Sequence, residues 1–124
     1  MLFSMGFASQ MKFVNVSDGT GESAVLKVDV SALAANQNGL ACNGVTIRRI
    51  HASVNGMSVN ILWDADTDVS AFVVAPGIYS FDLSTSPLWN NAGTGKTGDV
   101  LFTTIGASSG DTYSIILEMI KTYG

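Results

Sequence analysis

Three aspartates at alternating positions are the clearest candidates for metal chemistry in this sequence. Asp64, Asp66 and Asp68 could supply the hard oxygen ligands that Ca²⁺ prefers. A twelve-residue calcium loop that began at Asp64 would also need a glycine and a glutamate where this chain has Val69 and Ala75. Aspartates also favour turns, because they accept hydrogen bonds from nearby backbone amides. We therefore interpret the segment as a turn, with a calcium site as the alternative, and expect no metal or cofactor.

A glycine-rich segment, Ala92–Gly98, resembles the end of a phosphate-binding loop. That motif needs another glycine five residues before Gly95, where this chain has Asn90, and a helix that begins at Lys96. A strand is expected shortly afterwards instead. The segment is therefore predicted to be a surface loop and not a nucleotide site.

Nucleophilic catalysis has little support in the sequence. His51 is the only histidine and Cys42 the only cysteine, and no residue is placed to orient either side chain. Most acidic residues lie in predicted turns, where a structural use is the expectation. We therefore predict that the chain is not an enzyme. A single cysteine also excludes an internal disulfide.

The net charge and the composition argue against some classes of binding partner. The 124 residues carry 6 basic and 10 acidic side chains, a net charge of −4, which argues against a nucleic-acid surface. Hydrophobic residues make up 47% and charged ones 13%, and the mean hydropathy is +0.33. No apolar run reaches the ~18 residues of a membrane span. Because so apolar a chain needs to cover its surface, we expect a homo-oligomer or a symmetric array.

Short segments of alternating hydrophobicity, separated by turn residues, recur along most of the chain. This pattern is typical of an all-β, single-domain antiparallel β-sandwich, and about eight strands make a jelly-roll-like arrangement plausible. The one stretch with helical character is Ser31–Asn36, with Ser31 as its N-cap. The predicted strands are Met11–Val16, Ala24–Val30, Val45–Val54, Met57–Trp63, Val69–Val74, Ile78–Leu83, Asp99–Ile105 and Thr112–Lys121.

Two local signals refine these strands. The alternation changes parity at Arg48-Arg49, which predicts a β-bulge, and Asn55-Gly56 is a strong two-residue hairpin signal. The strand Ala24–Val30 is expected to supply the wall opposite the main core, through Leu26, Val28 and Val30. The residues expected to lead that core are Met57, Val59, Ile61, Trp63, Tyr113, Ile115, Leu117 and Met119.

The first ten residues differ from the rest. Residues 1–10 are apolar but lack the basic start and the long apolar stretch of a signal peptide. We predict an N-terminal arm over 1–10 and the sandwich over 11–124. Met1 and Met11 both remain possible starts of translation.

Three motifs lie within Val45–Gly124, about two thirds of the chain: Ile61–Asp68, Asn90–Asp99 and Gly110–Leu117. They resemble small virion proteins of tailed bacteriophages, particularly those of marine and cyanobacterial phages. The resemblance implies a jelly-roll-like protein that assembles in the host cytoplasm and lies on the virion at the capsid surface. Capsid decoration, in which the chain binds and stabilises the major capsid protein shell, is the first role it implies. Neck, tail or head-fibre components are the next.

Two apolar segments outside the predicted strands are the candidate partner contacts. They are the arm, through Leu2, Phe3 and Phe7, and the loop tip at Leu88-Trp89. The ring of Trp89 either packs under the sandwich or is exposed as a contact anchor, and the sequence leaves both open. A carbohydrate-binding module is a further alternative, which would need an exposed aromatic platform.

Overall fold

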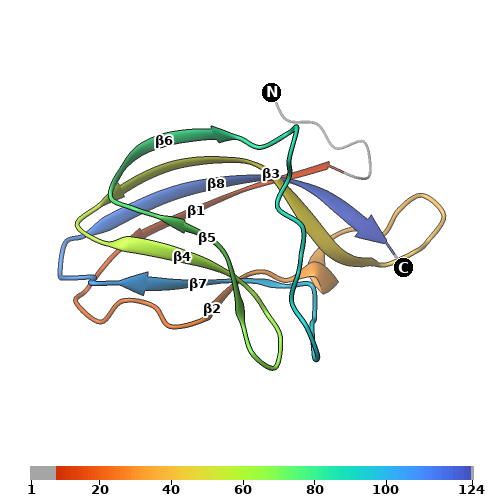
Figure 1. The fold of residues 1–124 in the computed structure, drawn as a ribbon, viewed down its shortest axis with the longest axis horizontal. Coiled ribbons are helices and arrows are strands. Elements are labelled where there is room, and N and C mark those ends of the chain that lie inside the picture. Colours follow the sequence, from red (N-terminus) through yellow and green to blue (C-terminus); the bar gives the residue numbers. More distant parts are fainter. Residues whose placement is uncertain (1–7, 124) are drawn as a thin grey trace.

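The computed structural model describes residues 8–123, which form a sandwich of two four-stranded antiparallel sheets (Figure 1). This confirms the predicted all-β class. Every predicted strand is present, and β1 begins three residues earlier than expected, inside the predicted arm. The strands are β1 (Ala8–Val16), β2 (Val25–Val28), β3 (Cys42–Asn55), β4 (Ser58–Trp63), β5 (Val69–Val74), β6 (Gly77–Asp82), β7 (Val100–Ile105) and β8 (Thr112–Tyr123).

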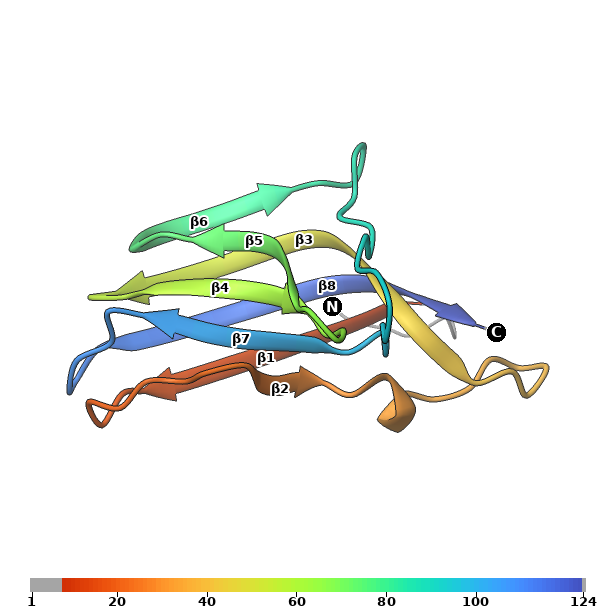
Figure 2. The same ribbon diagram turned by 60° about the horizontal axis from the view of Figure 1, so that its bottom comes forward.

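The strand order is that of a jelly roll. The first sheet has the order β1-β8-β3-β6 and the second has the order β2-β7-β4-β5. Figure 2 shows the two sheets face to face, with β1 and β2 on one side of the sandwich and β5 and β6 on the other. The two sheets therefore stack as two layers, and each layer has an open edge on both sides of the sandwich.

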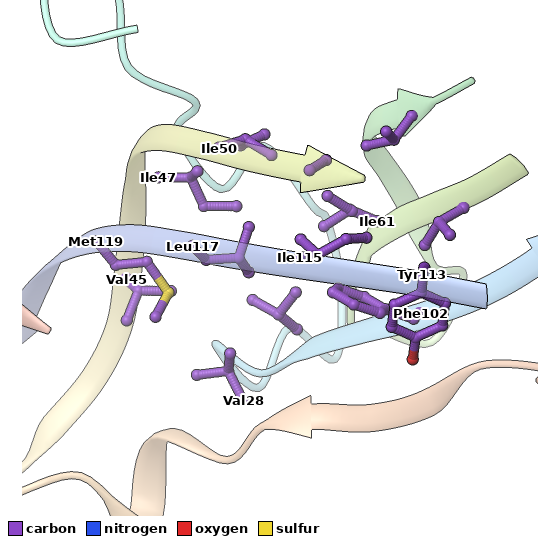
Figure 3. Packing of buried hydrophobic residues seen from close by; sticks show 14 of the residues in the cluster. Val28, Val45, Ile47, Ile50, Ile61, Phe102, Tyr113, Ile115, Leu117 and Met119 are labelled. Atoms are coloured by element: carbon purple, nitrogen blue, oxygen red, sulfur yellow. The ribbon is translucent and has the colours of Figure 1, made fainter. Parts of the chain in front are cut away.

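Alternating side chains from both sheets fill the space between them (Figure 3). In β8 the residues at odd positions from Tyr113 to Met119 are buried, whereas Ser114 is exposed. All eight residues that were expected to lead the core are at most 2% exposed, which confirms the predicted parity. The core also takes Phe102 of β7, whose ring meets those of Phe13 and Tyr113 edge to face.

The predicted Asn55-Gly56 hairpin needs correction. Gly56 does adopt a left-handed conformation, with φ of +84°, between β3 and β4. These two strands do not pair, however, because β3 lies in the first sheet and β4 in the second. The short turn carries the chain across the sandwich, so the buried residues of both strands face one core.

The β2 region differs from expectation in two ways. Val28 and Val30 are buried as expected, but a register shift between Leu26 and Val28 leaves Leu26 exposed. The predicted helix Ser31–Asn36 is instead one 3-10 turn, η1 (Val30–Ala32). Its cap is Asp29, whose carboxylate accepts a hydrogen bond from the Ser31 N–H at 3.0 Å, so Ser31 is not the N-cap. The bulge predicted at Arg48-Arg49 is confirmed by a register shift between Ile47 and Arg49.

The connections gather at the two ends of the sandwich (Figures 1 and 2). One end holds the β1–β2, β3–β4, β5–β6 and β7–β8 connections, each of which joins a strand of one sheet to a strand of the other. The other end, here called the long-loop end, holds the β2–β3 connection, the β4–β5 turn at 64–68 and the β6–β7 loop at 83–99.

Of the described residues, η1 is the only helical element, and no helix among them could span a bilayer.

Candidate contact site at the long-loop end

Trp89 lies in the β6–β7 loop and is 68% exposed. Of the two alternatives for this ring, packed under the sandwich or exposed, the structure has the exposed one. The residue before Trp89 is fixed to the sandwich. Leu88 and Ile47 exchange backbone hydrogen bonds of 2.9 and 3.1 Å, and the Leu88 side chain packs against the core. Trp89 is therefore presented to solvent from a backbone that is held beside β3, and the partly buried Leu88 holds that backbone in place.

The rest of this loop is tied to the β4–β5 turn. The Thr97 hydroxyl donates to the Asp64 carboxylate at 2.8 Å, and the Thr97 N–H donates to the Asp64 carbonyl at 3.2 Å. The Asp66 N–H donates to the Thr94 carbonyl at 3.1 Å. The loop thus has hydrogen bonds to β3 of the first sheet and to the β4–β5 turn of the second, and its backbone does not need to be ordered on binding.

The same contacts show how the aspartates are used. Asp68 accepts the Ala65 N–H at 3.1 Å and so closes the turn, while Asp64 holds Thr97. Within residues 8–123 no group of three or more acidic, histidine or cysteine side chains is arranged to hold a metal ion. Lys96 lies in a hydrogen-bonded turn closed by its N–H and the Gly93 carbonyl, and no helix follows it.

Beside Trp89 the surface has a hollow of about 340 Å³. Its rim carries hydrogen-bonding groups that are mostly neutral, among them the Asn43 amide, which accepts the Thr122 hydroxyl at 3.0 Å. The hydroxyl of Tyr123, another residue of the rim, is buried and has no hydrogen-bond partner in the described part of the chain. The lining residues are Asn43, Gly44, Val45, Thr46, Trp89, Asn90, Lys96, Gly98, Thr122 and Tyr123.

The other predicted contact residues, Leu2, Phe3 and Phe7, lie outside the described residues. The structure therefore bears on the Leu88-Trp89 half of the predicted contact site and not on the arm.

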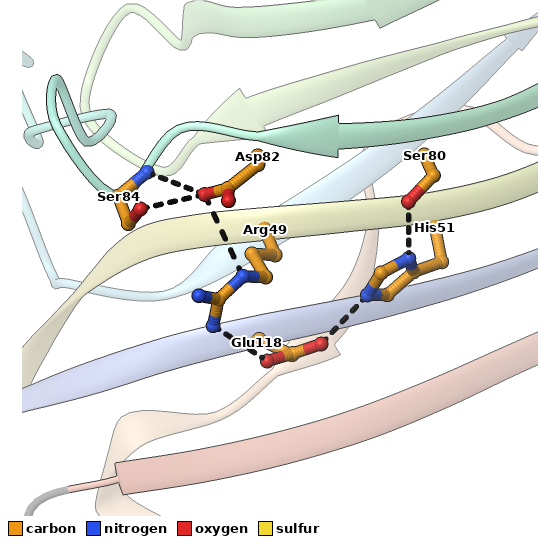
Figure 4. A network of polar contacts seen from close by, with 6 residues as sticks. All are labelled: Arg49, His51, Ser80, Asp82, Ser84 and Glu118. Atoms are coloured by element: carbon orange, nitrogen blue, oxygen red, sulfur yellow. Dashed lines mark hydrogen bonds and ion pairs between the residues drawn. The ribbon is translucent and has the colours of Figure 1, made fainter.

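A polar network lies on the outer face of the first sheet (Figure 4). His51 of β3 lies between two partners, with Nε2 2.6 Å from a Glu118 oxygen and Nδ1 3.0 Å from the Ser80 hydroxyl. Arg49 contacts the other Glu118 oxygen at 3.3 Å and Asp82 at 3.5 Å. The hydrogen bond from His51, followed by that from Arg49, holds the pKa of Glu118 below its usual value, against the opposing effect of burial.

Ser80, His51 and Glu118 have the order of a proton relay, but the surroundings do not favour catalysis. They lie on an open sheet face, and the hollow of about 60 Å³ that borders Glu118 and Arg49 is lined by neither His51 nor Ser80. We interpret the network as a set of cross-strand contacts that join β6, β3 and β8.

Cys42 and His51, the pair considered for nucleophilic catalysis, both lie on β3, which begins at Cys42. His51 is nine residues further along the strand, so extended chain separates their backbones by up to roughly 30 Å. The Cys42 thiol is buried and donates to the Gly44 carbonyl at 3.3 Å, whereas His51 faces outward. The two do not form a site.

No protein-family model matches this chain, and no curated protein matches it. The site geometry and the sequence motifs therefore supply the basis for a functional proposal.

Proposed function

We propose that this chain is a structural virion protein that decorates the capsid of a tailed phage, and that it binds the major capsid protein shell through the long-loop end. The observation that carries the proposal is Trp89, 68% exposed on a loop that is held in place by backbone hydrogen bonds. The resemblance of three motifs to phage virion proteins supplies the class of partner.

An exposed tryptophan on a fixed backbone suits a binding anchor. Large aromatic side chains contribute most to binding at the centres of protein interfaces, and a preorganised loop loses little entropy on binding. The 13% of charged residues leaves few ion pairs to hold a partner, so apolar and backbone contacts are expected to dominate. Binding should consequently change little between low and high salt.

The test compares Trp89→Ala with a matched control, Ile105→Ala. Ile105 is also an exposed apolar residue, but it ends β7 at the opposite end of the sandwich. Binding to purified capsids that lack this chain is measured for both variants and the unaltered protein. We expect Trp89→Ala to weaken binding by at least about 2 kcal/mol, roughly thirtyfold, and Ile105→Ala to leave it unchanged. The melting temperature should move by about 2 °C or less in both.

A Trp89→Ala variant that binds normally would contradict the proposed contact surface, and a chain that is absent from purified particles would contradict the virion role. Quantitative mass spectrometry of particles also separates the roles by copy number. Hundreds of copies would support decoration, whereas about six or twelve copies would indicate a neck or tail component with cyclic symmetry.

The hollow beside Trp89 favours carbohydrate binding as a second candidate function. A sugar has an apolar face that can lie on an indole ring, and its hydroxyls need neutral partners such as Asn43, Asn90 and Thr122. The volume of about 340 Å³ lies within the range of small-molecule sites.

Titration calorimetry with a panel of neutral oligosaccharides tests this candidate. Binding that is lost in both Trp89→Ala and Asn43→Ala would support a carbohydrate site, whereas no heat with any oligosaccharide would argue against it. Because the capsid assay uses no sugar, the two results are independent.

A further inference from the structure

Both sheets end in open edges. β1 and β6 are the outer strands of the first sheet, and β2 and β5 are those of the second (Figure 2). No described strand pairs with the outer side of any of the four. Because an unpaired strand edge offers backbone donors and acceptors to another chain, most proteins protect such edges with charged residues or prolines.

Here the four edge strands carry three charged residues, Lys12, Lys27 and Asp82, and a larger number of exposed apolar ones. Of the nine large hydrophobic residues that are exposed in the described chain, six lie on these four strands. Ile78 of β6 is 86% exposed, and Val14 of β1 is 61% exposed. The six are Val14, Val16, Val25 and Leu26 on the β1–β2 side, and Val73 and Ile78 on the β5–β6 side.

The register of the first sheet places the two edges at matching heights. Val14 pairs with Ser114, Ser114 pairs with Ser53, and Ser53 pairs with Ile78. These four residues form one row on the outer face of the sheet, with small side chains in the middle and large apolar ones at both edges. The exposed apolar residues of β1 and β6 therefore lie at the same level on opposite sides of the molecule.

The strand directions and charges of the two edges are also complementary. Neighbouring strands of this sheet are antiparallel, so β1 of one copy and β6 of another can join as an antiparallel pair that continues the sheet. In the register of the rows, Val14 lies opposite Ile78 of the second copy. Lys12 then lies opposite Ser80 of that copy and diagonal to its Asp82, within reach of an opposite charge.

Pairing of like edges lacks the charge match in every register, because β1 carries only a basic residue, Lys12, and β6 carries only an acidic one, Asp82. In a symmetric β6–β6 pair centred on Ser80, Ile78 would face the charged Asp82 of the other copy. A symmetric β1–β1 pair centred on Lys12 would place two lysines opposite each other, which is unfavourable.

We propose that copies of this chain associate side by side, with the β1 edge of one copy against the β6 edge of the next. The same contact brings Val25 and Leu26 of β2 toward Val73 of β5 in the neighbouring copy. Such a head-to-tail interface leaves one open edge on each outer copy, so it builds a closed ring or a continuing array. The inference does not depend on the virion proposal, since it rests on the edges alone.

The test uses the purified full chain with no capsid present. Molar mass is measured by sedimentation from about 1 µM to 1 mM, the range in which interfaces of ordinary strength are populated. The two edge variants are Val14→Lys and Ile78→Lys, and the control is Ile105→Lys, which adds the same charge away from the edges. Far-UV circular dichroism checks that each variant is folded.

We expect the unaltered chain and the control to associate. Each edge variant should begin to associate only at a concentration at least tenfold higher than the unaltered chain does. An equimolar mixture of the two edge variants should form a one-to-one complex, because each retains the edge that the other lacks. Val14→Thr and Ile78→Thr, which keep a β-branched side chain, should weaken association in the same direction.

Two outcomes overturn the inference. One is an unaltered chain that stays monomeric at 1 mM. The other is a mixture of folded edge variants that forms no complex while one of them still associates with itself, since that pattern marks a symmetric interface. Either result would leave capsid attachment through Trp89 untouched.

Discussion

Leu117 lies at the centre of β8 with its side chain wholly buried between the two sheets. Truncation to alanine removes buried methyl groups and leaves a cavity that neighbouring strands cannot fill. We expect Leu117→Ala to lower the free energy of unfolding by about 2–5 kcal/mol in urea denaturation. Ile116→Ala, one position along on the opposite and partly exposed face, is the matched control and should cost less. A loss below about 0.5 kcal/mol at Leu117 would mean that the inward parity of this strand is wrong.

Glu118 links stability to pH. Its pKa is lowered in the folded protein, chiefly by the hydrogen bond from His51, so the ionised carboxylate stabilises the fold. That contribution is present above the unfolded pKa of about 4.3 and is lost as the pH falls through the lower folded value. We expect Glu118→Gln to be less stable than the unaltered chain at pH 7, with the difference shrinking as the pH falls below about 4.3 and through the lower folded pKa.

Urea denaturation at several pH values measures this difference. A gap between the two proteins that stays constant from pH 7 to pH 3 would show that the carboxylate charge does not contribute. Because these side chains are about one third exposed, solvent screening is expected to keep the effect modest.

At the scale of single elements, Gly98 allows the end of the β6–β7 loop to pack closely against the backbone at the start of β3. Its φ is +90°, and a Cβ there would collide with the backbone carbonyl of Asn43. Gly39 has a similar φ of +83° but no neighbouring atom within 4 Å of its Cβ position. Alanine at Gly39 should therefore cost only the conformational penalty of about 1 kcal/mol, whereas alanine at Gly98 should cost more, because the backbone must also move. Equal losses in urea denaturation would contradict the close approach.

The β4–β5 turn is built from aspartates that accept hydrogen bonds from the protein itself. We therefore expect a chelator to leave the melting temperature almost unchanged. Thermal unfolding with and without excess Ca²⁺ measures this directly. A calcium-dependent rise of about 10 °C, well beyond the few degrees that ~1 kcal/mol produces in a domain of this size, would show that the turn binds the metal.

The whole molecule is organised by contacts between distant parts of the chain. β1 pairs along its full length with β8, so that Ala8 lies opposite Ile120. Consecutive strands mostly lie in different sheets, and β4 with β5 is the one consecutive pair that shares a ladder among the described strands. Because loop closure precedes such pairing, we expect refolding in milliseconds to seconds.

Stopped-flow refolding can be followed through the fluorescence of Trp63, which is buried in the core. The Trp89→Ala variant isolates that signal from the exposed indole. Refolding that is complete within about 0.1 ms would contradict the dependence of this fold on long-range pairing.

The sequence by itself determined the strands and the core, because both depend on local patterns. Alternation over residues 57–63 and in β8 identified eight of the buried core residues, and the change of parity at Arg48-Arg49 identified the bulge. Local reasoning was weaker where a competing side chain was decisive, as at Asp29, which caps η1 in place of Ser31.

Tertiary structure alone decided what lies side by side. Asn55-Gly56 is a turn signal both for a hairpin and for a turn between sheets, and the pairing of β3 with β6 and β8 shows which of the two it is. The exposure of Trp89 likewise depends on the Leu88–Ile47 bridge between segments about forty residues apart. The alignment of Val14 with Ile78 requires the register of all four strands of a sheet. Alternating hydrophobicity predicts which face of a strand a residue lies on, but it does not predict which residue of a neighbouring strand it pairs with.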